Sequence, residues 1–284
     1  MTKTTTGYSP VAAGRVWWQS IDPGTDATPL VLLHGGPGVP SYYLEPLKAL
    51  ADERRVVLYD QLGSGRSDHP DDPALWSVET FVDDLTRLVD DLGLTTFHLF
   101  GHSWGGMLAL AFFEKHPEHV ASLLLASPLV NVETWCADAA GLVGALPAAD
   151  RQALSGPTDA PAYRAAESEF YRRHFCNLDP WPEPLQRSVD ELGMGPYLTM
   201  WGPNEFTQTG NLRGRDYTPV VRSLEIPNLW LCGEDDEARP ETIGAFARMN
   251  PAGEFREFAG GTHSVHLEQP GVYLAALREF LARH

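Results

Sequence analysis

The chain reads Phe97-His98-Leu99-Phe100-Gly101-His102-Ser103-Trp104-Gly105 at the point that decides its fold. Residues 97–100 form a strand-like run, and residues 104–115 predict a helix that stops before Pro117. A G-x-S-x-G motif at such a strand-to-helix turn is typical of a nucleophilic serine, because small neighbours allow a sharp, strained turn that leaves the hydroxyl exposed. We therefore expect Ser103 to be a nucleophile; the alternative is an ordinary glycine-rich turn.

The regions around this turn alternate between strand-like and helical patterns. From Pro29 to Ser127 the alternation is that of a parallel sheet covered by helices. Strand-like runs occur at 30–33, 55–59, 97–100, 120–125, 228–232 and 255–258, and helical spacing occurs at 78–92 and 272–282. From about Val130 to Asp216 no strand-like run is found, which predicts a helical insertion. We divide the chain into a first core part (1–129), a helical cap (130–216) and a second core part (217–284).

Two backbone N–H groups are candidates for stabilising a negatively charged oxygen in the transition state. The N–H of Trp104 lies at the start of the predicted helix, next to the candidate nucleophile. The second donor is the N–H of Gly36, in the sequence His34-Gly35-Gly36-Pro37-Gly38 that directly follows the first strong strand. The alternative for this second segment is an ordinary turn.

A serine nucleophile needs a histidine to take its proton and a carboxylate to fix the tautomer of that histidine. In hydrolases with this motif both follow the serine in the chain. The strand at 228–232 leads into Gly233-Glu234-Asp235-Asp236-Glu237, and spacing alone does not choose among these four acids. The strand at 255–258 leads into a loop with His263 nearest its end and His266 as the lesser candidate.

Charge and hydropathy argue against several classes of function. The chain has 21 Lys and Arg against 38 Asp and Glu, a formal net charge of −17 that repels the phosphates of nucleic acid. Its longest apolar stretches, such as 108–113, are far shorter than the ~20 residues that a membrane helix requires. Residues 1–7 lack the apolar stretch of a secretory signal. We expect a cytoplasmic protein that binds neither nucleic acid nor a membrane.

The sequence carries no motif for a metal or a cofactor. Cys136, Cys176 and Cys232 are an odd number without C-x-x-C spacing, which argues against a disulfide framework and a zinc site. His263 and His266 lack an H-E-x-x-H arrangement, and the glycine-rich segment 63–67 lacks the G-K-[ST] of a phosphate loop. We expect no cofactor and no metal.

Six segments in chain order together resemble the proline iminopeptidase family. They are HGGPG (34–38), DQLGSGRS (60–67), GHSWGG (101–106), WGPNEFTQTGNL (201–212), GEDDEARP (233–240) and GGTHSVHLEQP (260–270). The resemblance spans nearly the whole chain. It implies an α/β-hydrolase fold, with a mostly parallel central sheet, flanking helices and a helical cap insertion.

The resemblance also implies roles for particular residues. The family's acid falls on Asp236 and its base on His263, and two glutamates that bind the free amino group of the substrate fall on Glu205 and Glu237. Such a pair is physically reasonable, because burying an ammonium costs free energy unless carboxylates accept its protons. The sequence departs from the family pattern at Ala238-Arg239, where Arg239 could narrow the pocket or pair with a carboxylate.

The expected function is that of a serine hydrolase that releases an N-terminal amino acid, proline or another small or apolar residue, through an acyl-enzyme. The expected substrate is a small peptide or an aminoacyl amide with a free amino group. Alternatives are an amidohydrolase that removes an aminoacyl group from a non-peptide small molecule, and a carboxylesterase or lactonase without amine recognition. A ligand-binding protein on a hydrolase scaffold is a further alternative, which the apparently intact set of serine, acid and histidine disfavours.

Overall fold

A computed structural model describes residues 2–284 and contains an eight-stranded sheet in the order β1-β2-β4-β3-β5-β6-β7-β8. The strands are β1 (Lys3–Val11), β2 (Gly14–Asp22), β3 (Leu30–Leu33), β4 (Val56–Tyr59), β5 (Phe97–His102), β6 (Val120–Ala126), β7 (Asn228–Gly233) and β8 (Gly253–Phe258). From β4 to β8 all neighbours in the sheet are parallel, and β2 pairs antiparallel with both β1 and β4. The expected mostly parallel sheet is therefore confirmed.

The β1–β2 hairpin at one edge of the sheet was not predicted from the sequence. β1 reads KTTTGYSPV, and most of its side chains are exposed. An edge strand of this kind carries little apolar periodicity, and its glycine and proline suggest a loop rather than a strand.

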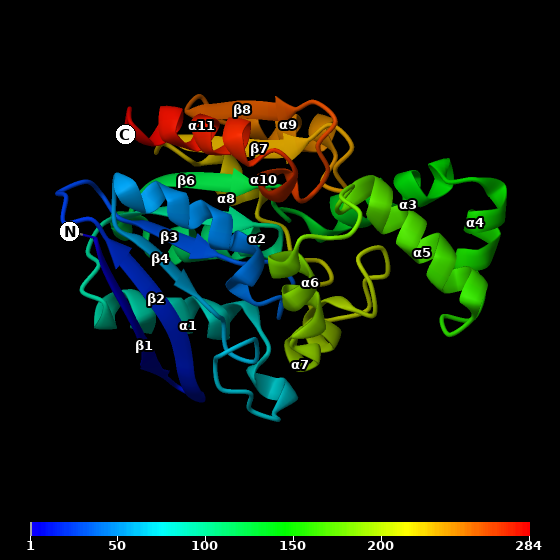
Figure 1. The fold of residues 1–284 in the computed structure, drawn as a ribbon, viewed down its shortest axis with the longest axis horizontal. Helices are drawn as coiled ribbons and strands as arrows, with labels where there is room; N and C mark the ends of the chain where they lie inside the picture. Colours follow the sequence, from blue (N-terminus) through cyan, green and yellow to red (C-terminus); the bar gives the residue numbers. More distant parts are fainter. Residues whose placement is uncertain (1) are drawn as a thin grey trace.

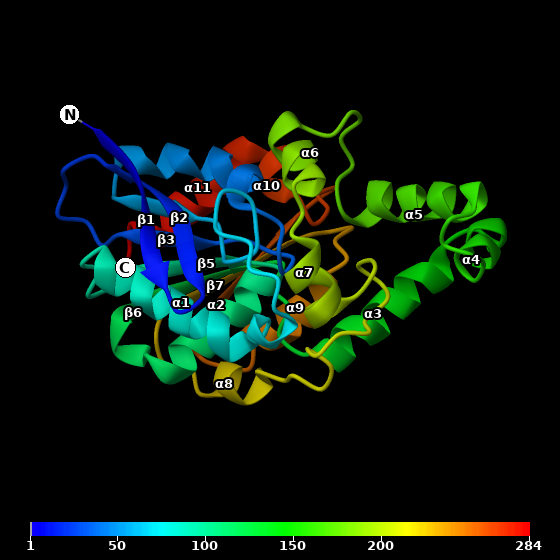
Figure 2. The same cartoon turned by 90° about the horizontal axis from the view of Figure 1, so that it is seen from below.

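Helices cover both faces of the sheet (Figure 2). The 3₁₀ segment η1 (Ser41–Asp52) and helix α11 (Pro270–Leu281), with the short α10 (Val265–Glu268) before it, pack on one face. Helices α1 (Val78–Asp91), α2 (Trp104–Lys115), α8 (Thr218–Arg222) and α9 (Pro240–Ala247) pack on the other. Each face therefore has its own hydrophobic layer, as in a three-layer α/β domain.

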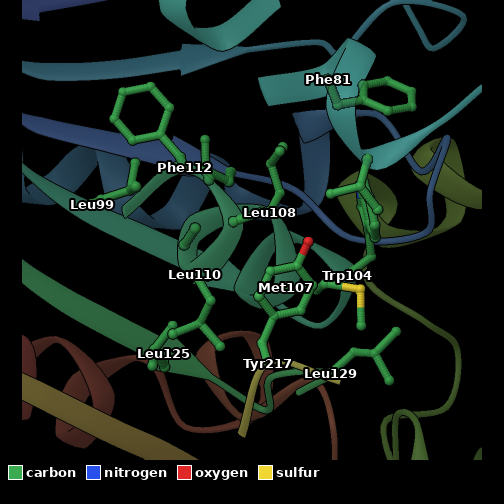
Figure 3. Packing of buried hydrophobic residues seen from close by; sticks show 14 of the residues in the cluster. Phe81, Leu99, Trp104, Met107, Leu108, Leu110, Phe112, Leu125, Leu129 and Tyr217 are labelled. Atoms are coloured by element: carbon green, nitrogen blue, oxygen red, sulfur yellow. The ribbon is translucent and has the colours of Figure 1, made fainter. Parts of the chain in front are cut away.

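Helix α2 lies at the centre of the larger layer (Figure 3). Its sequence WGGMLALAFF is apolar on every side, which is typical of a helix buried all round. Leu108 and Phe112 pack among Leu99 of β5, Leu125 of β6 and Phe81 of α1. The serine-bearing turn is thus anchored to the most buried helix of the fold.

The segment 130–216, which lies between β6 and α8, contains helices and no strand of the sheet. Its helices are α3 (Val132–Ala145), α4 (Ala148–Leu154), α5 (Pro161–His174), α6 (Glu183–Asp190), α7 (Met194–Pro196) and the π-helical turn η4 (Tyr197–Trp201). Helices α3 to α5 project beyond the end of the sheet, whereas α6 packs on η1 (Figure 1).

The two ends of this segment lie side by side. Asn131 and Asp216 form an isolated β-bridge, and the N–H of Tyr217 donates to the carbonyl of Val130 at 2.9 Å. The chain before Asn131 and the chain after Asp216 therefore meet at one point of the core. Within residues 2–284, none of the helices is long and apolar enough to cross a membrane.

Candidate active site

Ser103 lies at a strained turn between β5 and α2. Its φ is 56° and its ψ is −122°, in a region that residues with a side chain rarely adopt. The turn depends on glycine: a Cβ on Gly101 would lie 2.2 Å from the carbonyl oxygen of Gly105, and a Cβ on Gly105 would lie 2.3 Å from that of Leu33. Because Gly101 and Gly105 have no side chain, β5, α2 and β3 approach one another closely, and Ser103 lies at the tip of the turn between β5 and α2.

The loop after β3 lies directly against this serine. β3 pairs with β5 so that Leu33 is opposite Gly101, and a Cβ on Gly35 would lie 3.1 Å from the Cβ of Ser103. Gly36 has a φ of 111°, and a Cβ there would lie 2.7 Å from the nitrogen of Val39. This backbone conformation is accessible to glycine alone.

The backbone N–H groups of Gly36 and Trp104 have no acceptor among residues 2–284. Trp104 is the first residue of α2, so its N–H has no partner within the helix. Gly36 lines the cavity described below, and Trp104 directly follows Ser103, which also lines it.

His263 and Asp236 form a buried hydrogen-bonded pair. Nδ1 of His263 lies 2.8 Å from Oδ1 of Asp236, and the two side chains are almost completely buried. Asp236 also accepts the hydroxyl of Ser127 at 2.5 Å and the N–H of Ala238 at 2.8 Å. The carboxylate is therefore held in place, and a proton on Nδ1 leaves Nε2 as the free nitrogen of the ring.

The other acids and the other histidine of the two loops lie elsewhere. Glu234 accepts the N–H of Gly260 on the surface, and Asp235 is exposed. Nε2 of His266 lies 3.1 Å from the carbonyl oxygen of Tyr43, and burial lowers the pKa of His266 to about 3. His266 is thus a neutral residue that contributes to packing, and Asp236 is the acid that lies beside His263.

Glu205 and Glu237 bring two more carboxyl groups to the same place. Glu237 is 2% exposed, its Oε1 has no hydrogen-bond partner, and this atom lies 3.7 Å from Nε2 of His263. Glu205 accepts the hydroxyl of Tyr197 at 2.7 Å. Burial raises the pKa of both glutamates, and the charge of Glu205 raises that of Glu237 further. Among the described residues, neither carboxyl group is paired with a Lys or Arg, and the imidazole of His263 is the group that lowers the pKa of both.

These charges also act on His263. Burial lowers its pKa, but the carboxylates of Asp236, Glu237 and Glu205 outweigh this effect and raise the pKa to about 9. Because Nδ1 already donates to Asp236, these carboxylates favour a second proton on Nε2 in the free protein. Within residues 2–284, no hydrogen bond joins Ser103 to His263.

A cavity of about 220 Å³ is lined by some of the candidate residues. Ser103, His263 and Glu205 all line it, together with Tyr171 and Tyr197 from the cap. An apolar wall completes it, made of Val39, Phe175, Trp181, Leu185, Val189 and Leu192. The lining of the cavity therefore combines apolar side chains with the carboxyl groups of Glu167 and Glu205, whereas Glu237 is buried and does not line it.

Sequence reasoning missed several residues around the site. Ser127, with a φ of 46°, directly follows β6, a strand-end position comparable to those of Ser103 and Asp236. Polar residues after parallel strands gather at one edge of a sheet, so this signal was present in the sequence. Tyr197, in contrast, comes from an irregular cap helix with no such signal.

Arg239 lies outside the cavity. Its guanidinium lies 3.3 Å from Glu241 and 4.0 Å from Asp138, and it forms no ion pair with Glu237. Arg239, where the sequence departs from the family pattern, therefore does not line the cavity. A group of three potential metal ligands, His116, Glu118 and His119, follows α2 at the end remote from Ser103 and contains none of the candidate residues.

A mostly parallel eight-stranded sheet with a serine at the strained turn after β5 defines a serine hydrolase of the α/β hydrolase fold, and the model of that fold family matches residues 28–270. Within this class, the chain belongs to the proline iminopeptidase family. It is 38% identical to the proline iminopeptidase of Heyndrickxia coagulans over 284 residues, which cover 98% of each chain. The expected fold, enzyme class and family are thus confirmed.

Two solved structures are similar over the full length. The crystal structure of the proline iminopeptidase of Mycobacterium smegmatis gives a TM-score of 0.92 at 34% identity, covering 99% of this chain and 98% of its own. The crystal structure of VinJ gives a TM-score of 0.93 at 32% identity, covering 98% of each chain.

Proposed function

We propose that the protein is an aminopeptidase that releases an N-terminal amino acid, proline in the first place, from a small peptide or an aminoacyl amide. The observation that carries this proposal is that Glu237, 3.7 Å from Nε2 of His263, and Glu205, which lines the cavity, are paired with no Lys or Arg among the described residues. Relatives that match nearly the full chain are proline iminopeptidases, which supports proline as the released residue.

In the proposed reaction, Oγ of Ser103 attacks the carbonyl carbon of the N-terminal residue while Nε2 of His263 takes the serine proton. Asp236 holds the Nδ1–H through its 2.8 Å hydrogen bond and stabilises the imidazolium that forms. The N–H groups of Gly36 and Trp104 donate to the oxyanion of the tetrahedral intermediate.

Collapse of this intermediate completes the first half of the reaction. His263 returns the proton to the leaving nitrogen, the amide bond breaks, and an aminoacyl ester of Ser103 remains. Water then attacks this ester with His263 again as the base, and the free amino acid leaves.

The glutamates give the reaction its requirement for a free amine. A substrate ammonium in the cavity supplies the missing positive charge and donates charge-assisted hydrogen bonds to Glu205 and Glu237. An N-acylated substrate or a simple ester leaves both carboxyl groups uncompensated. Because unpaired buried polar groups are costly, we expect discrimination of roughly 10⁴-fold in favour of the free amine. This expectation disfavours the esterase and lactonase alternative.

A second candidate substrate is an aminoacyl group on a non-peptide small molecule. It is favoured by the apolar wall of the cavity, where Val39, Leu185 and Val189 offer no hydrogen-bonding groups to a peptide backbone. Comparing prolyl naphthylamide with the dipeptide Pro-Gly distinguishes the two. A large preference for the aromatic amide favours the small-molecule substrate.

The experiment that tests the proposed function measures kcat/KM for naphthylamides of Pro, Ala, Leu and N-acetyl-Ala. The wild type is compared with Glu205→Gln, and with Glu118→Gln as a control because Glu118 is an exposed glutamate at the far end of α2. We expect the free-amine substrates to be strongly preferred and Glu205→Gln alone to weaken this preference. Equal turnover of the N-acetyl substrate would show that the enzyme does not recognise an amine.

A further inference from the structure

The nitrogen of His263 that must receive the serine proton faces a second carboxyl group. Nε2 lies 3.7 Å from Oε1 of Glu237, and both side chains are 2% exposed. This oxygen has no hydrogen-bond partner among the described residues. The backbone N–H of Glu237 donates to the carbonyl of His174, which fixes the residue in the loop after β7. Glu237 is thus held next to the reactive nitrogen rather than toward solvent.

All charged groups that face His263 are anionic. Asp236 and Glu237 face it from the loop after β7, and Glu205 faces it from the cap. The ring centroid of His102, at the end of β5, lies 4.6 Å from that of His263. The ring of His266 contacts the ring of His102, at 5.3 Å between centroids. Burial lowers the pKa of both these histidines, so they are neutral. The remaining ring contacts come from Trp135 of α3 and from Phe175, which follows α5.

The surroundings of His263 therefore favour a protonated imidazole in the free enzyme. Burial raises the pKa of Glu237, and the surrounding carboxylates raise the pKa of His263 despite its burial. Because Nδ1 donates its proton to Asp236, the second proton of the imidazolium is on Nε2, which faces Oε1 of Glu237 at 3.7 Å. A protonated Nε2 has no lone pair with which to accept the hydrogen of the Ser103 hydroxyl.

We propose that the ammonium of the substrate displaces this proton, so that His263 becomes a base only when a free amine is bound. This inference rests on the proposed function, because it requires the amine to bind at Glu205 and Glu237. The ammonium enters with one positive charge and one proton leaves to solvent. The total charge of the site is unchanged, and Nε2 becomes free to accept the hydrogen of the serine hydroxyl.

Glu237 thereby acts as a positioning residue in two ways. It binds the amine of the correct substrate, and it blocks the base when that amine is missing. The enzyme then discriminates in favour of substrates with a free amino group in the chemical step as well as in binding. A compound without an amine that reaches the cavity still meets a protonated histidine.

The first test counts protons by calorimetry. Ser103→Ala, which cannot turn over, is titrated with prolinamide at pH 7.5 in buffers of different ionisation enthalpy. We expect close to one proton to be released per ligand bound, and close to none in Ser103→Ala/Glu237→Gln. Binding to Ser103→Ala without proton release overturns the proposal. This measurement does not depend on the folding of the Glu237 variant.

The second test uses p-nitrophenyl acetate, an ester without an amine. In the wild type, the acid limb of its kcat/KM profile should fall near pH 9, and Glu237→Gln should move it down by at least one pH unit. At pH 7 the variant should therefore hydrolyse this ester at least tenfold faster, while its kcat/KM for prolyl naphthylamide falls. Glu234→Gln is the matched control, because Glu234 lies in the same loop and faces the surface.

The outcomes separate the two proposals. Glu237→Gln could raise KM for prolyl naphthylamide but leave the pH profile of ester hydrolysis unchanged. In that case the proposed amine recognition is supported, and the proposed displacement of a proton from His263 is wrong. If neither quantity changes, both proposals are wrong.

Discussion

The hydroxyl of Ser127 donates a 2.5 Å hydrogen bond to Oδ2 of Asp236, although the two residues are 109 positions apart in the chain. They meet because β6 and β7 are parallel neighbours whose carboxyl ends lie at the same edge of the sheet. Ser127 thus fixes the carboxylate that in turn holds His263.

Removing this hydrogen bond should affect the chemical step. In Ser127→Ala, we expect kcat to fall about tenfold with little change in KM, by analogy with other residues that orient a catalytic group. The less stabilised carboxylate should also raise the pKa of His263, so that the acid limb of the kcat profile moves to higher pH. A lower kcat with an unshifted profile would mean that Ser127 has only a structural role.

Asp236→Asn should inactivate the enzyme without disturbing its fold. The amide N–H of an asparagine would donate to Nδ1 of His263 and force the proton onto Nε2, the wrong tautomer for a base. We expect kcat to fall by about 10⁴-fold with KM nearly unchanged. Asp235→Asn, one position earlier and exposed, should retain wild-type kcat. A loss of less than 100-fold for Asp236→Asn would contradict the proposed role of Asp236.

Tyr197→Phe tests the support of the amine site. The hydroxyl of Tyr197 donates to Glu205 at 2.7 Å, and its loss should raise the pKa of that glutamate and weaken its hold on an ammonium. We expect KM for prolyl naphthylamide to rise about tenfold, in line with the loss of a hydrogen bond to a charged group. Tyr217→Phe, in the core layer away from the site, is the control. Unchanged KM in Tyr197→Phe would mean that this bond does not support amine binding.

A buried aspartate in the core predicts a pH-dependent stability. Asp84 of α1 is 2% exposed and neither carboxyl oxygen has a partner among the described residues, and burial raises its pKa to about 7. The folded state therefore keeps a proton that the unfolded state has released above pH 4. The contribution of Asp84 to the free energy of unfolding therefore falls as the pH rises from about 4 to 7, and it stays low above pH 7.

Asp84→Asn should remove this dependence. At pH 8 we expect the variant to be more stable than the wild type by about 2–4 kcal/mol, and at pH 4 nearly equal to it. Urea unfolding at the two pH values measures the difference. Asp83→Asn is the control, because Asp83 is exposed and pairs with Lys115. An equal change at both pH values would show that Asp84 does not titrate in this range.

The parts of the fold that were predictable from sequence carry strong local patterns. The runs at 30–33 and 228–232 are apolar because these strands are buried on both faces, and they coincide with β3 and nearly with β7. The turn at Ser103 was recognisable because steric crowding permits only glycine on either side of it. The β1–β2 hairpin lacked such a pattern, since an exposed edge strand has no need of one.

The contacts within the candidate site were not predictable from the sequence. Spacing left four acids open after β7, and only the likeness to a known family selected Asp236. Which of these acids contacts His263 depends on how the loops after β7 and β8 pack against each other. The sequence pattern contains no information about this packing. The approach of Glu237 to Nε2 of His263 was unpredictable for the same reason, although both residues had been named.

The bridge between Asn131 and Asp216 has a consequence for how such enzymes diversify. Because the segment 130–216 starts and ends at one point, insertions within it do not require β6 or β7 to move. The carbonyl of His174 in this segment nevertheless accepts the N–H groups of both Glu237 and His263. A replacement cap can therefore change what the enzyme admits only if it keeps this one carbonyl, to which the loops after β7 and β8 are tied.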